Sequence, residues 1–137
     1  MTNKEFLMEP LRLRRQIQKM LQYKVAMEHM ADSPNSVNLD KPVVDKTRMY
    51  QAPFIAWIDK LIEVDDSIAK LRDRYEAVVE RVTEAISQLA NEDYRTILIM
   101  HYINDETWDT VASKIHVSLS TVKRWHYDAV NRLVQQS

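Results

Sequence analysis

Apolar residues recur at three- and four-residue steps through most of the chain, which is the period of an amphipathic helix. This period is clear in residues 5–31 and predicts a first helix that begins near Pro10 or a few residues before it. The stripe with its flanking residues consists of Leu13, Ile17, Met20, Met27, Leu7, Leu21 and Met30.

Residues 32–52 show no such period and are rich in polar residues and proline. We therefore predict a long loop here, with a short extended piece at residues 42–44. Pro53 suits the first turn of the helix that follows, because a proline at that point loses no hydrogen bond.

The next helix is predicted to be long, since three- and four-residue steps alternate without a break over about five heptads, as in a coiled coil. Two polar residues, Asp65 and Arg72, interrupt the line of positions that would face a partner helix. The full line is Phe54, Ile58, Leu61, Asp65, Ile68, Arg72, Tyr75, Val79, Val82, Ile86 and Leu89.

An antiparallel hairpin of these two helices would bring Lys24 near Asp65. Such a pair would fix the register of the helices, or it would serve as a switch or a partner contact. The charges of the two helices are complementary. Residues 1–31 hold six Lys or Arg against three Asp or Glu, and residues 53–90 hold five against eight. The basic helix could pair with the acidic one or face nucleic acid.

After Leu89 the pattern predicts three short helices, with Asn91, Thr107 and Ser118 as their N-caps. We expect them to end near Tyr102, Ile115 and Val134. Trp108 is expected to pack on the helix that contains residues 97–102.

Residues 107–133 fit a helix-turn-helix, whose geometry fixes where apolar and small residues fall. Ala112 stands where the two helices touch, and His116 occupies the turn position usually held by glycine. The remaining apolar positions of the expected type are Val111, Ile115, Val117, Val122 and Trp125.

If Val122 and Trp125 face inward, the helix period turns a polar, basic face outward, and this face would enter a DNA major groove. Lys123 and Arg124 can donate to guanine edges or phosphates, and Leu119 can meet a thymine methyl group. The candidate DNA-binding residues are Ser118, Leu119, Ser120, Thr121, Lys123, Arg124, Tyr127, Asn131 and Arg132. A module used only for protein binding would also fit the near-neutral charge.

The segment Val117-Ser118-Leu119-Ser120-Thr121-Val122-Lys123-Arg124, followed by His126 and Ala129, resembles region four of bacterial sigma factors. Together with residues 85–112 it is similar to the ArpU and RinA-like regulators of phages and prophages, over about the last 55 residues of the chain. The resemblance implies control of late phage genes, with DNA recognition by residues 118–127. It also implies a contact with host RNA polymerase.

Composition excludes several other classes of protein. The chain has no cysteine and no glycine, so disulfides, thiolate chemistry and glycine-built phosphate loops are excluded. The four histidines, His29, His101, His116 and His126, share no metal-ligand spacing, and we expect packing or surface roles for them. No cofactor, no metal, no catalytic site and no membrane segment is expected, and the chain suits the bacterial cytoplasm.

The sequence therefore predicts an all-α protein of two parts. Residues 1–90 form a long antiparallel helical hairpin or coiled coil, with its loop at 32–52, which could also form a homodimer. Residues 91–137 form a helix-turn-helix that binds double-stranded DNA at a promoter or operator. The alternatives are a packaging component like a small terminase subunit, and an adaptor that binds proteins and not DNA.

Overall fold

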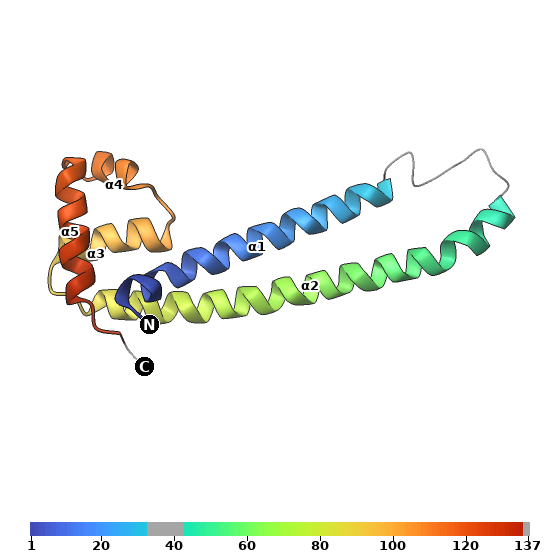
Figure 1. Cartoon of the computed structure of the whole chain (residues 1–137), viewed down its shortest axis with the longest axis horizontal. Coiled ribbons are helices and arrows are strands. Elements are labelled where there is room, and N and C mark those ends of the chain that lie inside the picture. The colour runs from blue at the N-terminus through green and yellow to red at the C-terminus, as the bar shows by residue number, and fades with distance from the viewer. Residues whose placement is uncertain (33–42, 136–137) are drawn as a thin grey trace. The chain divides into compact units, whose positions relative to one another are not determined.

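The structure is a computed structural model that describes residues 1–32 and 43–135, and the regular elements in these residues are all helices, with no β-strand. The long helices α1 (Asn3–Asp32) and α2 (Val43–Ser87) are followed by the short α3 (Glu92–Leu98), which continues into a π-helical turn, η1 (Ile99–Ile103). Helices α4 (Trp108–Lys114) and α5 (Leu119–Arg132) complete the chain, as Figure 1 shows. The predicted all-α fold is confirmed.

Helix α2 begins earlier than the sequence pattern predicts. Its residues 43–52 were expected in the loop, and residues 43 and 44 in an extended piece, but all are helical. Residues 43–52 contain neither proline nor glycine. The helix formed by the apolar segment that follows them can therefore extend back through these residues. Pro53 accordingly lies inside α2 and not in its first turn. The rest of the predicted loop, residues 33–42, lies outside the described residues.

The predicted partner-facing line of α2 is buried or half-buried except at three exposed positions, Phe54, Asp65 and Arg72. Leu61, Ile68, Val82 and Leu89 are buried or half-buried, but Asp65 and Arg72 are exposed. The residues that face α1 in their place directly precede them, so the observed line runs through Trp57, Leu61, Val64, Ile68, Leu71, Tyr75, Val78, Val82, Ala85 and Leu89. Neighbouring residues differ by about 100° around a helix. A line that passes through the residues just before Asp65 and Arg72 therefore contains neither of these two charged residues.

The described residues form two compact units. One consists of residues 15–72, where α1 and α2 pack antiparallel around Met27, Val64 and Ile68. The predicted contact between Lys24 and Asp65 is confirmed there, with Lys24 Nζ 2.7 Å from the carboxylate. The Trp57 indole N–H donates to the carbonyl of Met27 at 3.2 Å, which fixes the register of the hairpin.

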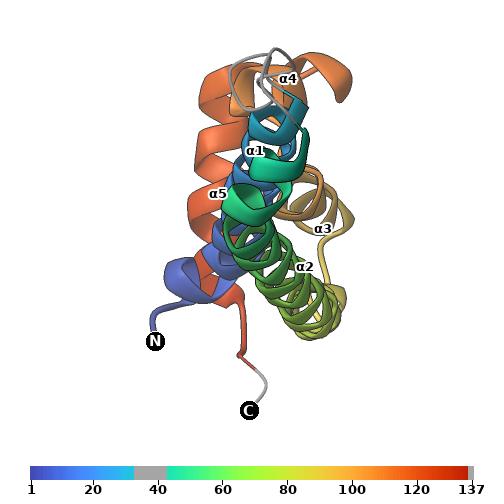
Figure 2. The same cartoon turned by 90° about the vertical axis from the view of Figure 1, so that its right-hand side faces the viewer.

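The other unit joins residues 1–14 to residues 73–137. Its buried residues come from the start of α1, the end of α2 and the short helices, and α4 lies beside the upper end of α5 in Figure 2. The predicted domain boundary at residue 90 stays a prediction. In the structure, the contacts group the start of α1 and the end of α2 with the short helices. The largest fully buried side chains of this unit are Tyr102, Leu7, Ile86, Ile97, Leu98, Val78, Val82, Val111, Val122 and Pro10.

Candidate nucleic-acid interface

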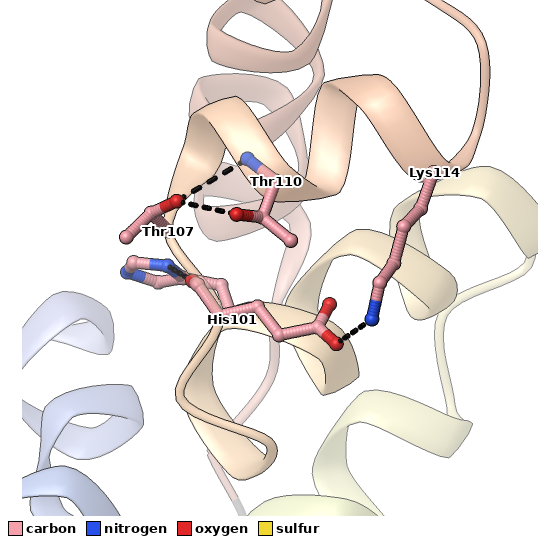
Figure 3. Close-up of polar contacts among 5 residues, drawn as sticks. His101, Thr107, Thr110 and Lys114 are labelled. Atoms are coloured by element: carbon pink, nitrogen blue, oxygen red, sulfur yellow. Dashed lines mark hydrogen bonds and ion pairs between the residues drawn. The ribbon is translucent and has the colours of Figure 1, made fainter.

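The three predicted N-caps all form. The Asn91 side chain accepts from the backbone N–H groups of Asp93 and Tyr94 at 2.8 and 3.3 Å. Thr107 accepts from the N–H of Thr110 at 3.2 Å, as Figure 3 shows, and Ser118 accepts from the N–H of Thr121 at 3.2 Å. Each cap satisfies a backbone donor that the first helical turn leaves free, so these polar residues set where the short helices begin.

The turn between α4 and α5 is a Schellman motif centred on His116. The N–H of Val117 donates to the carbonyl of Ala112 at 3.1 Å, and the N–H of His116 donates to that of Ser113 at 3.4 Å. This pattern requires a left-handed residue, and His116 has a φ of 60°. A side chain there costs about 1 kcal/mol relative to the glycine that such turns favour. The turn keeps its helix-turn-helix geometry in spite of that cost.

The inner face of the helix-turn-helix is the predicted one. Val111 and Val122 have no exposed surface, and Ala112 is 6% exposed at the contact between α4 and α5. Ile115, Val117 and Trp125 are half-buried around them. The register assigned from the sequence is therefore correct, and it determines which residues of α5 point outward.

A cluster of aromatic rings joins η1, α4 and α5. The Trp108 ring stacks on His101 with centroids 3.9 Å apart, and it lies 4.4 Å from the ring of His126. Tyr102 is 1% exposed, and its hydroxyl lies 2.5 Å from His126 Nε2. The predicted packing of Trp108 on the helix before it is confirmed. The sequence did not show that His101 and His126 meet at this tryptophan.

Both clustered histidines are neutral at pH 7. Burial lowers the pKa of His126 from 6.5 to about 4, and the nearby His101 and Lys4 act in the same direction. Burial also lowers the pKa of His101, although its bond to the carbonyl of Glu106 opposes this change. Because burial raises the pKa of Tyr102 to about 12, its hydroxyl keeps its proton and can donate it to the unprotonated Nε2 of His126.

We expect the stability of this unit to fall in mild acid. A histidine whose pKa is lower in the folded state stabilises the fold fully above pH 6.5, and this contribution is lost as the pH falls towards 4. The full shift at His126 would correspond to about 3 kcal/mol, and because its ring is only partly buried we expect about 1 to 2 kcal/mol. Urea unfolding at pH 7 and pH 4.5 measures this loss.

The variant His126→Gln isolates the contribution of that ring. Glutamine can still accept a hydrogen bond from Tyr102 but cannot be protonated. The loss of stability between pH 7 and 4.5 should therefore be smaller in His126→Gln than in the wild type. An equal loss in the two proteins would show that other groups cause the acid sensitivity.

The predicted outer face of α5 is accessible. Lys123, Arg124 and Asn131 are exposed, and Tyr127 is 69% exposed although it is aromatic. No acidic residue lies in the first turn of α5, and its single acidic residue, Asp128, is half-buried and accepts from the Tyr94 hydroxyl at 3.3 Å. The exposed charges of this helix are therefore positive.

The other predicted residues differ in how free their polar groups are. Ser120 is exposed, whereas Leu119 and Thr121 are half-buried. The Ser118 hydroxyl is engaged as the N-cap and lies 2.7 Å from that of Thr121. Arg132 is exposed but lies over the ring of Tyr94, with its guanidinium carbon 5.5 Å from the ring centroid. The side chains of Ser118, Ser120, Thr121 and Arg132 therefore already have contacts within the domain.

Two polar contacts that the sequence analysis missed hold the ends of helices. The Asn3 side-chain amide donates to the carbonyls of Val130 and Leu133 at 2.8 and 2.9 Å, which ties the end of α5 to the start of α1. The Arg95 guanidinium donates to the carbonyl of Leu89 at 2.5 Å, in the turn that follows the end of α2. The contacts of Asn3 span more than a hundred residues, and no local pattern marks them.

Residues 79–133 match the family Sigma-70, region 4. The match begins in the last turns of α2 and ends just after α5, so it covers the helix-turn-helix and the helices that support it. No curated protein and no solved structure matches the chain. The C-terminal part of the chain is thus a sigma-70 region-4-like helix-turn-helix. No helix within the described part is long and apolar enough to cross a membrane.

Proposed function

We propose that the chain is a sequence-specific DNA-binding transcription regulator and that α5 is its recognition helix. The observation that carries this proposal is the basic outer face of α5, in a domain that matches sigma-70 region 4. In a helix-turn-helix this helix enters the major groove with its N-terminal half against the base edges. The proposal is for a protein that binds DNA and not for an enzyme.

The outer residues differ in what they can contact on DNA. Arg124 and Lys123 have free cationic ends and are assigned to guanine edges or to phosphates. Ser120 lies in the first turn of α5, where the helix dipole and free N–H groups favour a phosphate. Leu119 can meet a thymine methyl group. Asn131 lies further along α5 and is assigned to the DNA backbone.

The biological setting that we propose is late-gene control in a phage or prophage, in the cytoplasm of a bacterial host. This part rests on the resemblance of residues 85–129 to ArpU and RinA-like regulators. A contact with host RNA polymerase belongs to the same proposal, because sigma region-four modules act at promoters together with the polymerase.

Selection of bound duplexes from a random DNA pool, followed by affinity measurements at several salt concentrations, tests the proposal. We expect one enriched motif and an affinity that falls with salt by about 0.9 logarithmic units per neutralised phosphate. Arg124→Ala should cost about 1 to 3 kcal/mol and relax the preference at one position of the motif. Lys123→Ala should weaken binding to all sequences if it contacts phosphate, and then lower the salt slope by about one unit.

Matched controls remove the same charges elsewhere. Arg74→Ala and Lys70→Ala change exposed residues of α2 that lie outside the helix-turn-helix, and neither should change the motif. If Arg124→Ala and Lys123→Ala both bind like the wild type, α5 does not read DNA through this face. If no motif is enriched and binding is absent at low salt, the domain is a protein-binding adaptor and the proposal fails.

A further inference from the structure

Helix α2 carries a second line of apolar residues that α1 does not cover. This outer stripe consists of Ile55, the half-buried Ile58, Ile62 and Ala69, at steps of three, four and seven residues. Ile55 and Ile62 are 55% and 54% exposed, and Ala69 is also exposed. Such a repeat places side chains on one face of a helix, and a line of exposed isoleucines is costly in water.

The outer stripe lies beside the hairpin contact and not within it. The residues that face α1 are Trp57, Leu61, Val64 and Ile68, whereas the stripe is rotated away from them to the side that carries Asp65. Lys24 bonds Asp65 on that same side of the hairpin. On α1 the next residue, Val25, is 62% exposed. One face of the hairpin therefore presents apolar side chains from both helices.

Exposed charges of opposite sign occur on the two helices of the hairpin. Asp59 and Asp66 are exposed and seven residues apart, so they share one side of α2. Arg15 and Lys19 are exposed and four residues apart on α1. Among the described side chains of residues 15–29 and 54–72, the ion pairs involve only Lys24 with Glu28 and Asp65, and Lys60 with Glu63. The hairpin therefore leaves these four charges without partners among the described side chains.

We propose that a second copy of this chain covers the outer stripe and forms a four-helix bundle from two hairpins. In this dimer, α1 of one copy packs antiparallel on α2 of its partner, and the same contact occurs twice because a two-fold interface is self-complementary. The charges favour this pairing, because Arg15 and Lys19 of one copy then face Asp59 and Asp66 of the other. Two copies of α2 packed against each other would instead bring the aspartates together.

The proposal does not depend on DNA binding, and its test is the mass of the full chain in solution without DNA. Sedimentation equilibrium should give a dimer for the wild type at micromolar concentration. Ile62→Asp places a charge in the centre of the stripe and should raise the dimer dissociation constant about 100-fold. Val134→Asp changes an equally exposed apolar residue outside residues 15–72 and should leave the mass unchanged.

Charge reversal distinguishes contacts between two copies from contacts within one hairpin. One variant combines Asp59→Lys with Asp66→Lys, and the other combines Arg15→Glu with Lys19→Glu. Each variant alone should be a monomer, since its like charges meet at both contacts. Mixed in equal amounts, the two variants should form a heterodimer in which every contact joins opposite charges. The control Glu84→Lys with Asp109→Lys should remain dimeric.

Several outcomes would overturn the proposal. They are a monomeric wild type, a ring of many subunits, either reversal variant remaining a dimer, or a mixture that stays monomeric while circular dichroism shows both variants folded. A variant that fails to fold is replaced by Ile55→Asp, which should dissociate the dimer in the same way. Because the mass is measured without DNA, failure here leaves the proposed DNA recognition by α5 intact.

Discussion

Replacing Tyr102 with alanine is expected to lower the free energy of unfolding of the C-terminal unit by about 3 to 5 kcal/mol. Tyr102 is among the largest side chains with almost no exposed surface, and its ring packs beside those of Trp108 and His126, at centroid distances of 6.2 and 5.7 Å. Its removal leaves a cavity that rings on three different elements border. It also leaves His126 Nε2 without its bond from the Tyr102 hydroxyl. Urea unfolding followed by circular dichroism measures the loss.

Two further variants separate the causes of this loss. Tyr102→Phe keeps the ring and removes the hydroxyl, and it should cost about 1 to 3 kcal/mol because His126 is then left partly buried without its bond. Tyr23→Ala removes the same side chain from the exposed surface of α1 and should change stability by no more than about 0.5 kcal/mol. If Tyr102→Ala were no more destabilising than Tyr23→Ala, Tyr102 would not pack as the structure shows.

Replacing Ala112 with leucine is expected to lower stability by about 1 to 3 kcal/mol and to abolish sequence-specific DNA binding. Ala112 lies at the contact of α4 with α5, and its carbonyl accepts the N–H of Val117 in the turn. A leucine there would push the two helices apart. The position of α5 would change, and so would the outer face that we propose to read DNA.

The control for this prediction is Ala77→Leu, which enlarges an exposed alanine of α2. It should leave both stability and DNA binding unchanged. The decisive measurement combines thermal unfolding with binding to the selected motif. A stable Ala112→Leu protein that still binds the motif would show that the assigned packing of α4 on α5 is wrong.

The sequence by itself determined the features that depend on neighbouring residues. Asn91, Thr107 and Ser118 cap the helices that they were predicted to cap, because a cap bonds N–H groups only two or three positions away. The inner residues of the helix-turn-helix were identified for the same reason, since the short turn at His116 fixes their relative placement. The left-handed His116 could be located without glycine because the surrounding apolar spacing marks the turn.

Only the tertiary structure decided the features that join distant parts of the chain. The sequence of α2 is compatible with two lines of apolar residues that are one position apart. Helix α1 packs against the line that contains Val64, so Ile62 stays exposed and Ile58 half-buried in the outer stripe. Tyr102 and His126 are 24 residues apart, and Asn3 and Val130 are 127 apart. Helical periodicity describes one helix at a time. Which of its faces is covered depends on where the other helices lie, and this is set by packing across the whole fold.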